Sequence, residues 1–163
     1  GGSESIPSVD DARSAIRELP DEQITSDLKA TVDYALQIPA SNKKIAVSGF
    51  CWGGTQTFRF ATNDDRPKEF YVFYGGGPSD KEELARIGGP IQGFYAENDA
   101  RVNVTIEASE KAMKDLGKTF VPVIYEGGGH GFMRAGQDPA GSAENRAARE
   151  KAWARWLDLL HDL

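Results

Sequence analysis

The sequence predicts an α/β fold, in which a mostly parallel sheet has helices on both faces. Short runs of apolar, aromatic or β-branched residues alternate with segments of helical periodicity, and Gly/Pro-rich turns separate them. Strands that alternate with helices of ten or more residues are joined by right-handed crossovers, which place the strands parallel. At 163 residues, the chain is expected to form one domain, 1–163.

The first forty residues predict two helices. Ser8 can cap a short helix that ends before Pro20. A longer amphipathic helix is expected from Asp21 to about Ile38, where a proline stops the pattern.

The remainder of the chain predicts four strands with helices between them. Strands are expected at 45–48, 70–74, 90–96 and 119–125, and helices at 52–61, 80–87, 103–117 and 142–161. The apolar run of the first strand predicts burial on both faces. A flexible glycine-rich loop is expected at 127–129, and one face of the last helix is expected to carry Trp153, Trp156, Leu157 and Leu160.

The strand at 45–48 leads into a Gly-x-Cys-x-Gly-Gly turn with Cys51 at its centre. This is the pattern of a nucleophile elbow in which cysteine replaces serine. The turn is expected to strain the backbone of Cys51, while Gly49 and Gly53 avoid collisions with the neighbouring strand and helix. The helix that follows should lower the thiol pKa and favour the thiolate. The alternative is an inert buried cysteine.

Two further residues complete a possible triad. Asp99 and His130 each follow a predicted strand, so parallel strands would bring both to the ligand-binding edge near Cys51. The order nucleophile, acid, histidine is that of α/β-hydrolases. His130 would hold the thiol proton or pair with the thiolate, Asp99 would orient His130, and the Trp52 N–H would donate to the oxyanion. Alternatively, Asp99 is a turn or cap residue and His130 an idle loop histidine.

These motifs, together with the run His130-Gly131-Phe132-Met133-Arg134, resemble the dienelactone hydrolase family from about Asp27 to the C-terminus. The resemblance implies an α/β-hydrolase fold that opens a lactone through a thioester, without metal or organic cofactor. It also implies that Arg134 binds a substrate carboxylate, so that the substrate is a small anionic lactone or ester. Phe50 and Tyr74 are expected to contribute to the pocket, with plain core packing as the alternative.

The family's fold begins with strands that have no counterpart here. The sequence therefore predicts a C-terminal portion of the fold whose second oxyanion donor lies elsewhere. We expect an N-terminal fragment of the same protein, or another copy, to pair with the strand at 45–48. Two other functions stay open: a general carboxylesterase with the same triad, and a catalytically silent fragment that acts in assembly or binding.

Composition argues against two other classes of partner. The net charge is −6, and no Lys/Arg-rich run could follow a phosphate backbone, so nucleic acid is not expected. No apolar run is long enough to span a membrane, and residues 1–5 lack the features of a signal peptide. We therefore expect a soluble protein, cytoplasmic by default, although an exported parent remains possible. Cys51 is the single cysteine and forms no internal disulfide.

Overall fold

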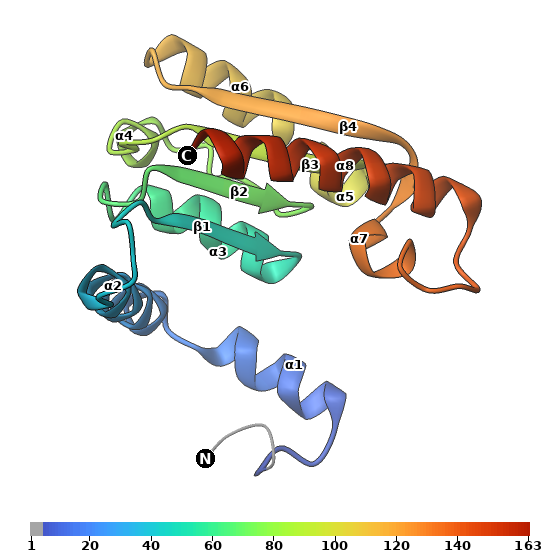
Figure 1. The fold of residues 1–163 in the computed structure, drawn as a ribbon, viewed down its shortest axis with the longest axis horizontal. Helices are drawn as coiled ribbons and strands as arrows, with labels where there is room; N and C mark the ends of the chain where they lie inside the picture. The colour runs from blue at the N-terminus through green and yellow to red at the C-terminus, as the bar shows by residue number, and fades with distance from the viewer. Residues whose placement is uncertain (1–4) are drawn as a thin grey trace.

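The computed structural model describes residues 5–163, and a parallel four-stranded sheet lies at its centre (Figure 1). The strand order is β1-β2-β3-β4, so each strand pairs with the next along the chain. The strands are β1 (Ala46–Phe50), β2 (Glu69–Phe73), β3 (Ile91–Asn98) and β4 (Phe120–Gly129). Residues 1–4, part of the start considered for a signal peptide, lie outside the described residues.

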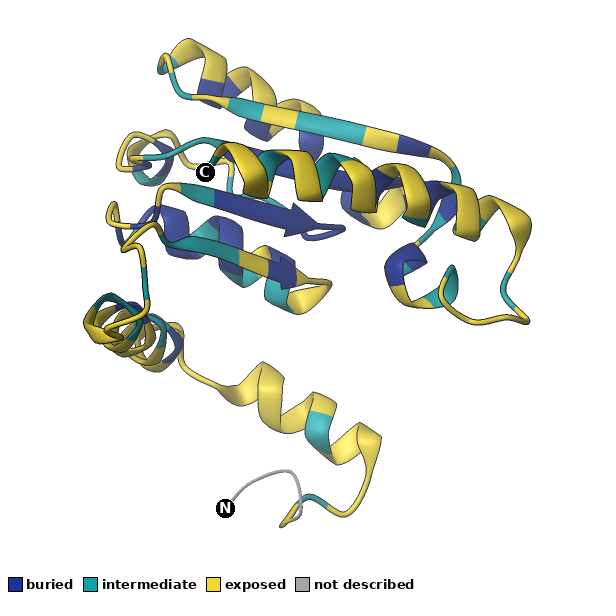
Figure 2. Cartoon of the chain, in the orientation of Figure 1, coloured by how far each residue is buried: buried dark blue, intermediate teal, exposed yellow. Residues whose placement is uncertain are grey.

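Helices cover both faces of the sheet, as the sequence predicts. They are α1 (Val9–Glu18), α2 (Asp21–Gln37), α3 (Trp52–Ala61), α4 (Lys81–Leu84), α5 (Ala100–Asn103), α6 (Ile106–Asp115), α7 (Phe132–Ala135) and α8 (Ala143–Asp162). Along β2, Phe70 and Val72 join a core formed with α2, α3 and α6. Tyr71 and Phe73 point the other way and join a core formed with α7 and α8. Figure 2 shows β2 buried between these layers.

The first strand is less buried than its apolar sequence predicts. In β1, Ala46 and Val47 are half-buried, while Ser48 and Phe50 are exposed. Among residues 5–163, no strand pairs with the second edge of β1, which explains the difference. A groove of about 430 Å³ runs along this edge, between β1 and α2.

The last helix carries the four expected large side chains, but among them only Trp156 packs against the core. Ala148 and Ala152 are buried against the sheet, whereas Trp153 is 40% exposed, and Leu157 and Leu160 are exposed as well. Arg155 fixes this orientation because its guanidinium donates to the carbonyl of Gly93 at 2.9 Å and lies over a core aromatic ring. The small alanines let the helix approach closely, and Trp156 and Leu159 pack, partly buried, against the same core.

Several boundaries differ from the expected ones. The strand expected at 119–125 continues through the glycines at 127–129, so this segment is not a free loop. The helix expected at 103–117 is interrupted at Val104 and Thr105, which separate α5 from α6. The helix expected at 80–87 contains only four helical residues, and α7 was not expected.

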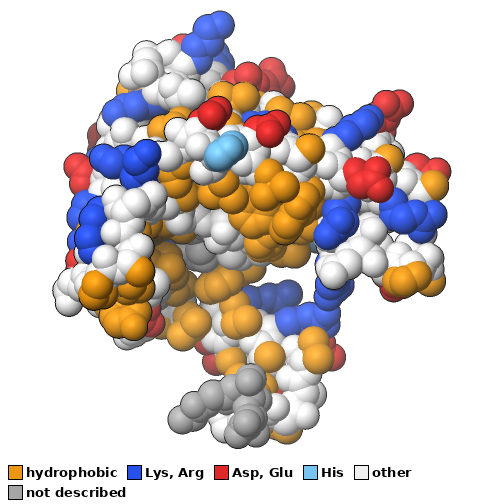
Figure 3. All heavy atoms as spheres, in the orientation of Figure 1, with side chains coloured by type: hydrophobic (Ala, Val, Ile, Leu, Met, Phe, Trp, Pro, Cys, Tyr) orange, Lys and Arg blue, Asp and Glu red, His pale blue; other side chains and the backbone are white. Residues whose placement is uncertain are grey.

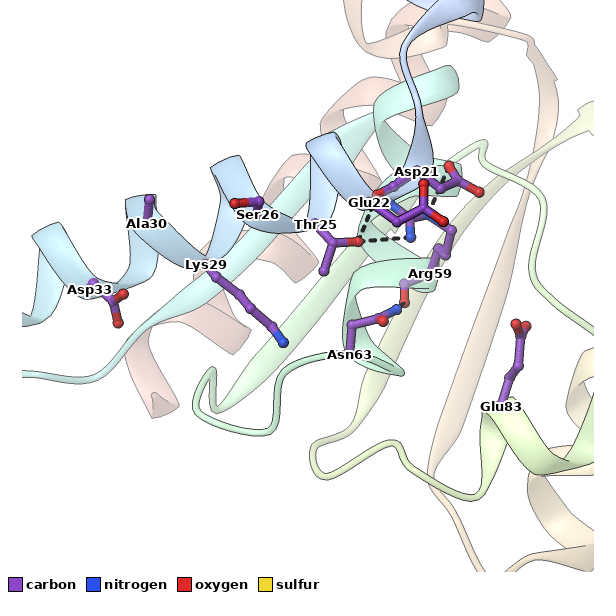
Figure 4. Close-up of a pocket in the computed structure, with 10 residues that line it drawn as sticks. All are labelled: Asp21, Glu22, Thr25, Ser26, Lys29, Ala30, Asp33, Arg59, Asn63 and Glu83. Atoms are coloured by element: carbon purple, nitrogen blue, oxygen red, sulfur yellow. Dashed lines mark hydrogen bonds and ion pairs between the residues drawn. The ribbon is translucent and has the colours of Figure 1, made fainter.

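The second helix is held in place by Arg59 of α3. Its guanidinium donates to the Thr25 hydroxyl at 2.9 Å and to the Asp21 carbonyl at 3.1 Å (Figure 4). These contacts lie beside a polar pocket formed by α2, α3 and α4. Among residues 5–163, no helix has the length and apolar character needed to cross a membrane.

Candidate active site

The turn between β1 and α3 has the geometry of a nucleophile elbow. Cys51 has φ 55° and ψ −120°, a conformation that is costly for a residue with a Cβ. A Cβ on Gly49 would lie 2.1 Å from the carbonyl oxygen of Gly53, so glycine is required at this position. Gly53 itself was expected to avoid a similar collision, but a Cβ there would meet nothing within 4 Å. The close approach occurs instead at Gly54, where a Cβ would lie 2.6 Å from the carbonyl oxygen of Phe73.

Asp99 and His130 are hydrogen-bonded at the carboxyl edge of the sheet. Asp99 ends up just after β3, with only 6% of its side chain exposed, and His130 follows β4. The distance from His130 Nδ1 to Asp99 Oδ2 is 2.5 Å. Although Asp99 is the residue before α5, its side chain makes no capping hydrogen bond there. Because a carboxylate can only accept, Nδ1 donates and Nε2 of the imidazole is left free.

Side chains hold the glycine-rich segment before His130 on both sides. The Gly127 N–H donates to Glu97 Oε2 at 2.8 Å, and the Gly129 N–H donates to Asn145 Oδ1 at 2.9 Å. Asn145 belongs to the first turn of α8, whereas Glu97 is near the end of β3. The segment expected to be flexible is therefore fixed, and it presents His130 in a defined position.

Cys51 and His130 line one pocket of about 990 Å³. The other predicted pocket residues, Phe50, Trp52, Tyr74 and Arg134, all line it as well. Figure 3 shows a patch of hydrophobic side chains above a hollow in the molecular surface. The structure thus brings the residues proposed from three strand ends to one place.

The pKa of the Cys51 thiol is shifted in the direction opposite to the one that the sequence predicts. Cys51 is exposed, but partial desolvation of its thiol in the pocket raises the pKa, and nearby Asp99 raises it further. Arg134 and Arg101 lower the pKa, but not enough to cancel the effect of desolvation. The expectation of a lowered thiol pKa is therefore wrong, and a base is needed to remove the proton at neutral pH.

The aromatic wall next to the histidine comes from Tyr74 and Phe50. The rings of Tyr74 and His130 are 5.2 Å apart and inclined at 60°. Burial and the neighbouring Cys51 raise the pKa of Tyr74, which therefore stays neutral. Phe50 is 40% exposed and stacks on Phe73, with ring centroids 4.5 Å apart. These contacts give the pocket an apolar side next to its polar residues.

Three arginines that sequence reasoning missed also line the pocket. Arg13 and Arg17 lie four residues apart on α1, and Arg149 lies on α8. The spacing of Arg13 and Arg17 places them on one side of a helix, but the sequence does not show which side faces Cys51. Among residues 5–163, no three His, Cys, Asp or Glu side chains are grouped as a metal site would need.

Comparisons with known proteins identify the family. The sequence model of the family described as the dienelactone hydrolase family matches residues 4–163 of this chain. A putative carboxymethylenebutenolidase from Methylorubrum extorquens is 30% identical over 154 residues, which cover 88% of this chain and 52% of that protein. Another from Saccharolobus solfataricus is 32% identical over 139 residues, covering 85% of this chain and 51% of that protein. The chain spans about half the length of these relatives.

Solved structures share the fold. A putative dienelactone hydrolase from Klebsiella pneumoniae superposes with a TM-score of 0.74 at 23% identity, covering 88% of this chain and 62% of that chain. A dienelactone hydrolase-like promiscuous phosphotriesterase from metagenomic libraries superposes with a TM-score of 0.72 at 20% identity, covering 87% of this chain and 62% of that chain. The expected α/β-hydrolase fold is confirmed. With a family match over almost its whole length, the chain belongs to the dienelactone hydrolase family.

Proposed function

We propose that this chain carries the catalytic residues of a hydrolase that opens a small lactone or cleaves a small carboxylic ester. The observation that carries the proposal is the hydrogen bond between Asp99 and His130, beside the strained Cys51 in one pocket. These three residue types supply a nucleophile, a general base and an orienting carboxylate. Family membership supports hydrolytic chemistry of this type.

In the first step, His130 Nε2 takes the thiol proton while the Cys51 sulfur attacks the substrate carbonyl carbon. The carbonyl π bond breaks, and its electron pair moves to oxygen, giving a tetrahedral oxyanion. Asp99 stabilises the imidazolium that forms, because its carboxylate already accepts the Nδ1 hydrogen bond. Trp52 is the first residue of α3, and its N–H has no acceptor within the helix, so it can donate to the oxyanion.

In the next step of the reaction, the tetrahedral intermediate collapses and the carbon–oxygen bond of the ester breaks. The leaving alkoxide takes the proton from His130, and a thioester remains on Cys51. His130 then removes a proton from water, whose oxygen attacks the thioester carbonyl. When this second intermediate collapses, the carbon–sulfur bond breaks with its electron pair on sulfur, the carboxylic acid leaves, and His130 returns the proton to the sulfur.

The pocket favours an anionic substrate. Arg134 lines it together with Cys51 and lies close enough to lower the thiol pKa. A guanidinium there can bind a substrate carboxylate through paired hydrogen bonds while the thiol attacks a carbonyl elsewhere in the molecule. The aromatic side formed by Phe50 and Tyr74 suits an unsaturated or cyclic carbon skeleton.

Full activity is expected to need residues beyond this chain. The second edge of β1 is unpaired within residues 5–163, and one oxyanion donor gives only part of the usual stabilisation. An N-terminal fragment of the same protein that adds strands beside β1 would supply the partner and the second donor. Loss of one such donor costs roughly a hundredfold in kcat.

The test is to compare wild type with Cys51→Ala on an anionic lactone and on a neutral short ester. We expect the variant to lose hydrolysis of both, because no other side chain occupies the elbow. A preference of the wild type for the anionic lactone supports the lactonase proposal, whereas a preference for the neutral ester indicates a general carboxylesterase. Near-normal kcat in Cys51→Ala would overturn the proposed nucleophile.

A further inference from the structure

The pocket that contains Cys51 has a charge opposite to that of the whole protein. The chain has 25 acidic and 19 basic residues, and its net charge is −6. Within the described part of the chain, however, no Asp or Glu lines this pocket. Four arginines line it: Arg13, Arg17, Arg134 and Arg149. Four guanidinium groups without carboxylates beside them in the wall point to a ligand that carries more than one negative charge.

These arginines form two groups that come from different parts of the fold. Arg134 follows His130 by four residues and lowers the pKa of Cys51. The other three are Arg13, Arg17 and Arg149. They come from α1 and α8, while Arg134 comes from α7. In Figure 3, basic side chains on α1 face the rest of the molecule across a hollow.

The group on α1 and α8 has unused capacity to bind an anion. Arg149 is half-buried and lies 5.4 Å from the Trp153 ring, but its Nε is buried and has no hydrogen-bond partner. A buried donor without an acceptor is costly, and an anion would remove that cost. Arg13 is paired with Asp10 at 2.7 Å, but both side chains are largely exposed, so this pair is weak.

We propose that the substrate is a small ester or lactone with two carboxylates. This inference rests on the proposed function and makes its substrate class more specific. One carboxylate binds Arg134 near the reacting carbonyl. The second binds Arg17 and Arg149 on the side of the pocket formed by α1 and α8, where the Trp153 ring covers the connecting carbon chain.

The test measures binding to Cys51→Ala through the fluorescence of Trp52 and Trp153, which both line the pocket. The probes are adipate, with two carboxylates, and hexanoate, which has the same number of carbons and one carboxylate. We expect adipate to bind about tenfold to a hundredfold more tightly, as one additional charge-assisted contact predicts. The difference should shrink as the salt concentration rises.

Substitutions in the same background separate the two groups of arginines. Arg17→Gln and Arg149→Gln should remove the advantage of adipate and leave hexanoate binding unchanged, whereas Arg134→Gln should weaken both probes. Lys151→Gln is the matched control, because Lys151 is exposed on α8 and does not line the pocket. Equal affinities for the two probes, or an Arg149→Gln result like that of the control, would overturn the inference.

Binding to Cys51→Ala requires no turnover, so it is judged separately from hydrolysis. Equal binding of the two probes, with Cys51-dependent hydrolysis in the wild type, rejects the two-carboxylate substrate and leaves the proposed function in place. Hydrolysis that survives in Cys51→Ala rejects the proposed function, whatever the binding result.

Discussion

The Cys51 thiol shows how two local effects compete at one residue. It sits where the N-terminus of α3 would favour a thiolate, but partial desolvation of the thiol and the carboxylate of Asp99 raise its pKa. The strained backbone and the glycine at position 49 could be predicted from the elbow motif. The direction of the shift in the thiol pKa could not be predicted, because it depends on desolvation and on charges brought from other strand ends.

Alkylation of Cys51 by iodoacetamide should follow this raised pKa. Only the thiolate reacts, so the rate should reach half of its maximum at a higher pH in the folded protein than in the urea-unfolded chain. Arg134→Gln removes a group that lowers the pKa and should shift the profile to still higher pH. Asp99→Asn removes a group that raises the pKa and should shift it to lower pH. A folded-state profile below that of the unfolded chain would show instead that the helix N-terminus dominates.

At the scale of elements, helix α3 could be predicted with its bounds, 52–61, because the elbow fixes its start. The end of strand β4 could not be predicted, because the glycines at 127–129 suggest a loop. Only the structure shows that side chains from β3 and α8 hold these glycines through hydrogen bonds. For a related reason, the sequence does not show which side chains of α8 pack against the sheet. Two alanines and Arg155 set its orientation through contacts with the sheet that the sequence alone does not reveal.

The junction of β1 and α3 gives a matched pair of substitutions. Gly49→Ala would place a Cβ 2.1 Å from a carbonyl oxygen, so we expect a loss of at least about 1–3 kcal/mol in the free energy of unfolding. Gly53→Ala places its Cβ in open space within a helix, so stability should stay unchanged or rise by up to about 1 kcal/mol. Urea unfolding measures both. Similar stabilities for the two variants would contradict the described geometry of the elbow.

At the scale of the whole molecule, β1 has one edge without a strand partner among residues 5–163, and α8 carries exposed apolar side chains. The groove of about 430 Å³ lies along the same edge. An edge of this kind pairs readily with another chain. We therefore expect residues 1–163, purified alone, to associate with increasing concentration, as measured by light scattering.

Leu157→Glu should reduce this association because Leu157 is 50% exposed on α8. Val104→Glu is the control, since Val104 is 76% exposed at the end of α5. A monodisperse wild-type monomer at all concentrations would show that the open edge is tolerated. If the two substitutions change the association equally, the chains associate through a surface that does not include Leu157.

The fold places Cys51, Asp99 and His130 at one edge of the sheet, and we propose that they act as a catalytic triad. Trapping an acyl group on the chain tests this central proposal most directly. The chain is mixed with 4-nitrophenyl acetate, quenched with acid and digested with trypsin, and its peptides are analysed by mass spectrometry. We predict an acetyl group on Cys51, in the peptide from Ile45 to Arg59, and a much lower yield in His130→Ala. Release of nitrophenol with the label on another residue, or with equal labelling of Cys51 in His130→Ala, would contradict the account.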